Sequence, residues 1–131
     1  VSYKQSKLIN EIIKFIEEHF AENITVESLS KKFSLSRSQI FRYFKETIDM
    51  SPQQYLKQYR INHAANLLRT TNLSVENIKT ACGFNDLCNF IRQFSSVYHR
   101  SPPAFRKYVL THSAAYNMEH SPSDLSDDDI K

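Results

Sequence analysis

Apolar side chains recur at helical spacing along most of the chain. Thr25 precedes a short apolar stripe over residues 26–33, and Ser36 precedes another over residues 37–48. Because Thr and Ser are favoured N-caps, this pattern predicts two helices separated by a three-residue break. An amphipathic first helix is predicted over residues 5–20, with Lys and Glu on its polar side. Its apolar positions are Leu8, Ile9, Ile12, Ile13, Ile16 and Phe20.

A long helix is predicted to follow. Ser51-Pro52 combines a cap with a proline at the first helical position, and the helical pattern then runs to about Thr70. At 1.5 Å per residue, a helix over residues 52–70 would be about 28 Å long. The positions predicted to face a core are Tyr55, Leu56, Tyr59, Ala64, Leu67 and Leu68.

The pattern then starts again, and this internal repeat is the most informative feature of the chain. Residues 25–27 match residues 74–76 at an offset of 49. Ser51-Pro52 matches Ser101-Pro102 at an offset of 50, so the second turn is one residue longer than the first. Each copy is a short helix, a turn of three or four residues and a second helix. This is the layout of a helix-turn-helix motif, whose second helix enters the major groove of DNA.

Glycine is almost absent, with Gly83 the only one in 131 residues. It stands where the short helix of the second copy must stop, which predicts a left-handed C-cap, and Ser34 holds the equivalent place in the first copy. A single glycine excludes a Walker loop and a dinucleotide-binding fingerprint, which both need more. The chain also lacks the Asn-Gly pairs of tight hairpins. The fold class is therefore predicted to be all-α.

Residues that carry catalytic or metal chemistry are sparse. Cys82 and Cys88 are too few for a four-thiolate zinc site or a disulfide scaffold, and the five His residues are scattered. No nucleophile has an evident base, so the sequence predicts no catalytic residues, no enzyme, no cofactor and no metal site. A redox or metal sensor built on Cys88 is an alternative, because thiolates bind soft metals.

Charge is divided unevenly along the chain. Residues 1–110 carry 16 Lys and Arg against 9 Asp and Glu, a net charge of +7, whereas residues 111–131 carry one Lys against five acids. The basic part favours an anionic partner such as nucleic acid. The acidic tail, 111–131, is predicted to be disordered, and its competition with DNA for the basic part is one hypothesis. Without an apolar span, a signal peptide or an initiator Met, we expect a cytoplasmic chain with no membrane partner, cut from a longer protein.

The second helix of each copy carries an arginine at the same place. Arg42 lies on another face than the inward-pointing Ile40 and Phe44, and an offset of 50 places Arg92 at the corresponding position. A guanidinium there can donate to O6 and N7 of guanine. The residues predicted to contact bases are Arg37, Ser38, Phe41, Arg42, Leu87, Cys88, Asn89, Ile91, Arg92 and Gln93.

Phosphate contacts are predicted at helix starts and at nearby cations. Ser51-Pro52 and Ser101-Pro102 open helices whose first backbone N–H groups are expected to be unpaired and suited to phosphate. The long helix between the copies is expected to let one chain reach two successive major grooves, about 34 Å apart. The predicted phosphate contacts are Ser36, Lys45, Ser51, Arg100, Ser101, Arg106 and Lys107, with Lys57 a further cationic candidate.

A wider set of residues, within the two motifs and in the long helix between them, forms a recognisable pattern. It comprises Leu29-Ser30, Leu35-Ser36-Arg37, Phe44-Lys45, Ser51-Pro52, Tyr55-Leu56, Arg60, Ala64, Leu67-Leu68, Ala81-Cys82-Gly83-Phe84, Phe90, Arg92, Phe94 and Ser101-Pro102. With this set, residues 8–109 resemble the DNA-binding domain of AraC/XylS-type transcription regulators.

The resemblance implies seven helices in a domain of residues 1–110. Two tandem helix-turn-helix subdomains, about 8–50 and 74–109, are joined by the long helix 52–70. It implies binding to double-stranded promoter DNA and activation of transcription, with RNA polymerase a candidate partner. An effector or dimerisation domain is expected on a missing N-terminal part.

Three positions depart from the family pattern. Asp49 and His99 stand where the family has Gly, and Ser95 stands where it has a basic residue. A reshaped turn and a less polar second recognition surface are therefore expected. The alternative function is a helical protein-interaction module whose basic face docks an acidic partner. Sequence-dependent affinity for DNA would discriminate between the two functions.

Overall fold

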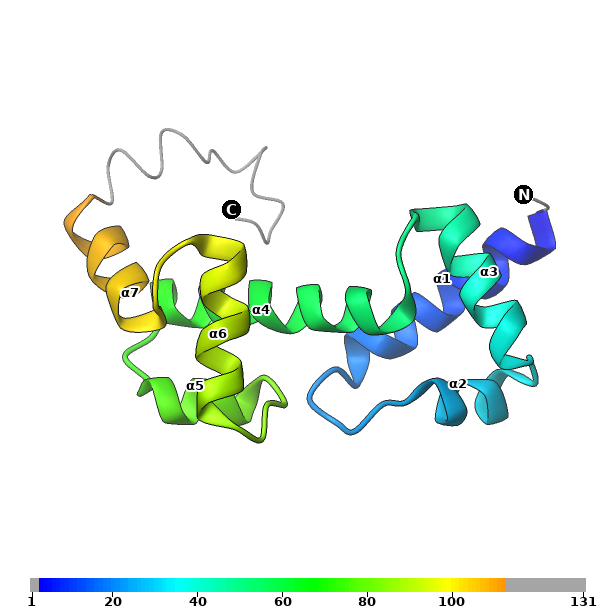
Figure 1. Cartoon of the computed structure of the whole chain (residues 1–131), viewed down its shortest axis with the longest axis horizontal. Helices are drawn as coiled ribbons and strands as arrows, with labels where there is room; N and C mark the ends of the chain where they lie inside the picture. Colours follow the sequence, from blue (N-terminus) through cyan, green and yellow to red (C-terminus); the bar gives the residue numbers. More distant parts are fainter. Residues whose placement is uncertain (1–2, 113–131) are drawn as a thin grey trace. The chain divides into compact units, whose positions relative to one another are not determined.

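The computed structural model describes residues 3–112, which form seven α-helices and no strand (Figure 1). The predicted all-α fold class is confirmed. Apart from residues 111 and 112, the predicted acidic tail lies outside the described residues. The helices are α1 (Tyr3–Glu18), α2 (Val26–Phe33), α3 (Arg37–Ile48), α4 (Pro52–Thr70), α5 (Val75–Ala81), α6 (Leu87–Tyr98) and α7 (Pro102–Thr111).

Two capping boxes set the starts of α2 and α3 where the sequence predicts them. Thr25 Oγ1 accepts a hydrogen bond from Ser28 N at 3.0 Å, and Ser28 Oγ accepts one from Thr25 N at 3.0 Å. Ser36 and Gln39 make the same reciprocal pair at 3.1 and 2.9 Å. Each box satisfies backbone N–H groups that have no partner inside the helix, so short-range sequence determines both boundaries.

The described residues divide into two compact units, the first ending at Tyr59 and the second beginning at Arg60, so the boundary lies within α4. In the first unit, α1 and α2 both pack against α3. Of the apolar positions predicted for α1, Ile9, Ile12 and Ile16 are fully buried and the others are half-buried. The buried cluster of the first unit consists of Ile9, Ile12, Ile16, Leu29, Ile40, Phe44 and Leu56.

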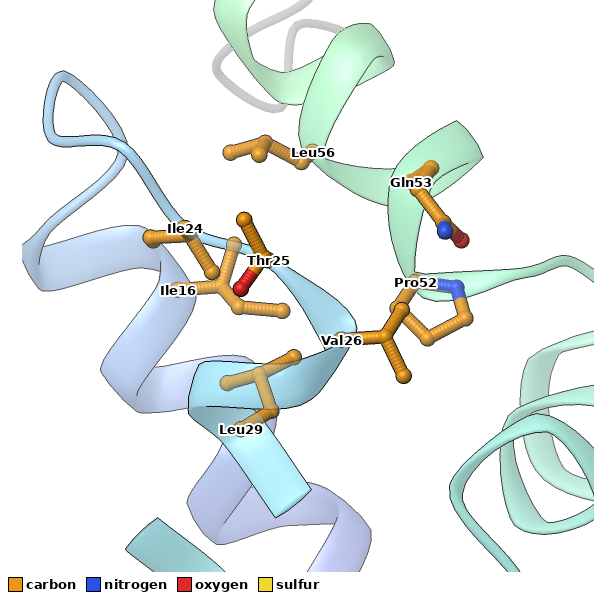
Figure 2. Close-up of a pocket in the computed structure, with 8 residues that line it drawn as sticks. All are labelled: Ile16, Ile24, Thr25, Val26, Leu29, Pro52, Gln53 and Leu56. Carbon is orange, nitrogen blue, oxygen red and sulfur yellow. The ribbon is translucent and has the colours of Figure 1, made fainter. Parts of the chain in front are cut away.

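A small, mostly apolar pocket lies in the first unit (Figure 2). Its side chains come from α1, from α2 and the segment before it, and from the first two turns of α4. None of the residues predicted to contact DNA lines it, so this pocket is separate from the predicted site. The lining residues are Ile16, Ile24, Thr25, Val26, Leu29, Pro52, Gln53 and Leu56.

The second unit has a core centred on aromatic rings. Phe94 has no exposed surface, and its ring centroid lies 6.1 Å from that of Phe90, 4.9 Å from that of Tyr98 and 5.4 Å from that of Phe105. Helix α6 packs against both α5 and α7. The buried apolar side chains of this unit are Ile61, Ala64, Ala65, Leu68, Ile78, Cys82, Phe84, Phe90, Phe94, Phe105 and Val109.

Helix α4 contributes side chains to both cores from different parts of its length. Leu56 belongs to the buried cluster of the first unit, and Ala64 and Leu68 are buried in the second. These three predicted core positions are confirmed. Ile61 and Ala65 are also buried, in addition to the positions predicted from the sequence. The other predicted positions, Tyr55, Tyr59 and Leu67, are half-buried.

Left-handed residues end several helices of the described chain. Ser34 has a φ of 55° and Gly83 a φ of 89°, as predicted for the two copies. Asp49 and His99 have φ values of 57° and 61°, so both turns keep a conformation that glycine favours, and the expected reshaping is wrong. The second turn has five residues rather than the expected four, because Cys82, with a φ of −95°, already lies outside α5.

We expect His99→Gly to stabilise the second unit. A side chain with a Cβ in the left-handed region costs roughly 1–2 kcal/mol, and the greater freedom of glycine in the unfolded chain offsets part of this gain. The net gain should be about 0.5–1 kcal/mol, measured by chemical denaturation. As a control, Gln58→Gly at an exposed position inside α4 should lose about 1 kcal/mol. A loss with His99→Gly would mean that the imidazole makes a stabilising contact.

The two cysteines lie in different environments. Cys82 is fully buried, and burial raises the pKa of its thiol to about 12, whereas Cys88 is exposed. Because the thiolate is the reactive form, we expect a thiol reagent to modify one cysteine in the native protein and both in denaturant. The folded Cys88→Ser variant should therefore not react rapidly with the thiol reagent. Equal reaction rates at the two native thiols would contradict the burial of Cys82.

Candidate nucleic-acid interface

Helix α3 turns one face to the core and another to solvent, as predicted. Ile40 and Phe44 have no exposed surface. Residues three and four positions apart share a face of a helix, so the solvent side forms a continuous strip. This strip, the outer face of α3, consists of Ser38, Phe41, Arg42 and Lys45, and among these only Phe41 is half-buried.

Arg42 is an exposed cation on the outer face of α3. Its Cζ lies 5.1 Å from the centroid of the Tyr43 ring. A cation–π contact of this kind does not use the N–H donors of the guanidinium. Among residues 3–112, no carboxylate lies within ion-pair distance of Arg42. Its donors are therefore available to a base or a phosphate.

Arg37 is held at the start of α3 by two neighbours. Its Nη1 donates to Oε2 of Glu27 on α2, and its Cζ lies 5.7 Å from the centroid of the Phe41 ring. Ser36, predicted to contact phosphate, uses its hydroxyl to cap α3. Glu27 could not be identified from the sequence, because a residue ten positions away across a turn gives no local signal.

Lys45, predicted to contact phosphate, forms an ion pair with Asp49. Its Nζ lies 2.8 Å from Asp49 Oδ1, and both side chains are exposed. The hydrogen bond from Lys45 and its charge lower the pKa of the Asp49 carboxyl, and the same interactions raise the pKa of Lys45. The carboxylate thus partly neutralises a cation at the end of the outer face of α3.

Helix α6 presents a corresponding face. Arg92 and Cys88 are exposed, while Asn89 and Gln93 are half-buried. Asn89 Oδ1 accepts hydrogen bonds from Arg92 Nη2 at 2.7 Å and from Gln93 Nε2 at 3.0 Å. Asn89 therefore orients two of the predicted base contacts, a link that the i+3 and i+4 spacing indicates. The outer face of α6 also includes Leu87 and Ile91, both half-buried, and the half-buried Ser95.

Two of the predicted phosphate contacts have partners within the second unit. Arg106 donates from Nε to Leu68 O and from Nη2 to Thr71 O, both at 3.1 Å. These hydrogen bonds satisfy two carbonyl groups at the end of α4, so Arg106 stabilises the fold there. The Arg100 guanidinium lies 3.9 Å from the centroid of the Tyr108 ring and is exposed. The remaining cationic candidates, Lys57 and Lys107, are exposed.

The first turn of α7 has no free backbone N–H group. Pro102 and Pro103 carry none, Ala104 N donates to Ser101 Oγ at 3.2 Å, and Phe105 N donates to Ser101 O at 2.8 Å. The expectation of unpaired donors there is wrong, because prolines and the cap account for all of them. At α4, the predicted phosphate contact Ser51 caps the helix in the same way, accepting from Gln54 N at 3.1 Å.

No helix among residues 3–112 is both long and apolar enough to cross a bilayer. The same residues bring together no group of three or more His, Cys, Asp or Glu side chains that could hold a metal ion.

Two helix-turn-helix units, each with an exposed arginine on its second helix, define a double helix-turn-helix domain of the kind that binds DNA. Residues 29–108 match the family described as "Helix-turn-helix domain". The chain belongs to this family and, within it, to the DNA-binding domains of AraC/XylS-type transcription regulators.

Three relatives show how far the similarity extends. The transcriptional activator RhaS of Citrobacter koseri is 36% identical over 99 residues, which are 76% of this chain and 36% of RhaS. The C-terminal domain of the response regulator yesN from Fusobacterium nucleatum is 33% identical, with a TM-score of 0.68 over 75% of this chain and 97% of that one. The DNA-binding domain of AdpA, solved with a target DNA, is 26% identical, with a TM-score of 0.70 over 92% and 99%. This chain therefore spans about a third of the curated relative.

Proposed function

We propose that this chain binds double-stranded promoter DNA and reads its sequence with α3 and α6, each placed in a major groove. The observation that carries this proposal is the matched pair of exposed arginines, Arg42 and Arg92, on the outer faces of the two helices. Arginine can donate two hydrogen bonds to guanine, and the second helix of the motif is the element that fits the groove. A packing hairpin has no need for the same exposed cation twice.

The other predicted residues have supporting roles in this proposal. Ser38 and Gln93 contact base edges, and Phe41 and Ile91 contact thymine methyl groups. Asn89 positions Arg92 as well as contacting a base. Further base contacts come from Arg37, Leu87 and Cys88. Phosphates are contacted by Ser36, Lys45, Ser51, Arg100, Ser101 and Lys107, and by Arg106 through the N–H groups that do not donate to Leu68 O and Thr71 O.

The role of the whole protein is also part of the proposal, because the chain spans only about a third of RhaS. We propose a cytoplasmic activator in which a further domain supplies effector binding or dimerisation and RNA polymerase is the partner at the promoter. The name of RhaS as a transcriptional activator supports activation, and the AdpA domain with its target DNA supports duplex DNA as the ligand.

A selection from a random double-stranded DNA library tests the proposal. The purified chain is bound at near-physiological salt, and the retained duplexes are sequenced over several rounds. We expect enrichment of an asymmetric motif with two boxes about 10 bp apart, one turn of B-DNA. If no sequence is enriched although the protein is folded, the proposal is wrong and the alternative of a protein-interaction module is favoured.

A further inference from the structure

Helix α3 carries three cations, and two of them form ion pairs with carboxylates. Arg37 is paired with Glu27, and Lys45 is paired with Asp49. Among residues 3–112, Arg42 has no such partner. The paired cations lie toward the two ends of the helix, and the unpaired arginine lies between them.

Helix α6 of the second copy also presents one arginine without a carboxylate partner in the described part of the chain, but for a different reason. At the offset of 50, Leu87 takes the place of Arg37, and Ser95 takes the place of Lys45. The counterpart of Glu27, Glu76, pairs instead with Lys79 within α5, at 2.9 Å. Each of the two helices therefore presents one arginine without a carboxylate partner among the described residues.

We propose that Glu27 and Asp49 set the strength of sequence-independent DNA binding by holding Arg37 and Lys45 in ion pairs, so that Arg42 dominates recognition by α3. The inference rests on the proposed function. Non-specific affinity grows with each phosphate that a cation neutralises, because counterions are released. A carboxylate beside the cation removes part of that gain and also repels the phosphate.

The backbone at Asp49 is consistent with a role for its charge. Its φ of 57° lies in the left-handed region, which glycine adopts at less cost and which Asn tolerates as well as Asp. Of these residues only Asp supplies a negative charge to Lys45. The substitution Asp49→Asn therefore removes the charge while keeping the turn.

Charge-removing variants test the proposal against a matched control. Glu27→Gln and Asp49→Asn are compared with Glu11→Gln, which removes one exposed carboxylate from α1. Affinity for a random-sequence duplex is measured by fluorescence anisotropy from roughly 50 to 300 mM salt. We expect Glu27→Gln and Asp49→Asn each to bind about 3–10-fold more tightly at the low end, with a slope of log K against log salt steeper by about 0.5–1. Glu11→Gln should change affinity less than twofold.

Removing the cation that has lost its carboxylate partner shows whether the ion pair is responsible for the change in affinity. Lys45→Gln added to Asp49→Asn, and Arg37→Gln added to Glu27→Gln, should cancel the gain in affinity. A gain that persists without the cation would overturn the proposal, because the carboxylate would then act on binding independently of the cation that it pairs with. Thermal melting monitored by circular dichroism verifies that every variant is folded.

The remaining outcomes separate this proposal from the proposed function. If the wild type and all variants bind DNA, but Glu27→Gln and Asp49→Asn have the same affinity as Glu11→Gln, the ion pairs do not set the affinity. This proposal alone is then wrong. If the folded wild-type chain and every variant fail to bind any duplex at the lowest salt, the proposed function is wrong, and this inference is overturned with it.

Discussion

Phe94→Ala is expected to destabilise the second unit by about 3–5 kcal/mol. The Phe94 side chain is completely buried and lies among three other aromatic rings. Replacing it removes the transfer free energy of the ring and leaves a cavity that the surrounding rings cannot fill without moving. Because a small domain has only about 5–15 kcal/mol of stability in total, this single change should leave α5–α7 largely open.

Hydrogen exchange measured by mass spectrometry can locate this loss. In Phe94→Ala, amides of α5–α7 should lose protection by a factor of about 100 or more, while those of α1–α3 change much less. Phe44→Ala is the matched control, since Phe44 is fully buried in the cluster of the first unit and should give the reverse pattern. Equal loss of protection in both units from either variant would show that the chain unfolds as one cooperative body.

Features determined by neighbouring residues could be predicted from the sequence. The starts of α2 and α3 depend on a cap and its partner three residues later, so Thr25 with Ser28, and Ser36 with Gln39, place them. The inward positions of α3 follow from helical period, because Ile40 and Phe44 lie one turn apart. The left-handed caps at Ser34 and Gly83 follow from the repeat itself, which aligns the two turns.

Features that depend on the surroundings of a side chain could not be predicted in this way. The pairing of Arg37 with Glu27 depends on how α2 and α3 pack, and that of Arg106 with the end of α4 joins residues 35 and 38 positions apart. The sequence identified each of these arginines as a cation but could not show which were already occupied. The left-handed turn at Asp49 was missed for another reason: short-range propensity favours glycine there, and the rest of the fold imposes the turn on a residue that tolerates it.

Arg42→Ala is expected to weaken binding to the selected DNA by about 1–3 kcal/mol, or roughly 5–150-fold, and to relax the preference at one base pair. The reason is the loss of two donors from the only cation of α3 that has no carboxylate partner among residues 3–112. Lys45→Ala should have a smaller effect that is equal on all sequences, because its charge is already partly neutralised by Asp49. The measurement is equilibrium binding to the selected duplex and to duplexes that carry each single base-pair change.

Arg42→Lys separates readout of a base from attraction to a phosphate. Lysine keeps the charge but loses the planar fork, so affinity for random DNA should stay within about twofold while the preference at that base pair falls. Arg92→Lys should affect a different base pair, in the second box, because α6 carries its own arginine held by Asn89. If Arg42→Lys retains full sequence preference, or if Arg42→Ala weakens every sequence equally, Arg42 contacts the backbone. Sequence readout by the first unit would then depend on Ser38 and Phe41.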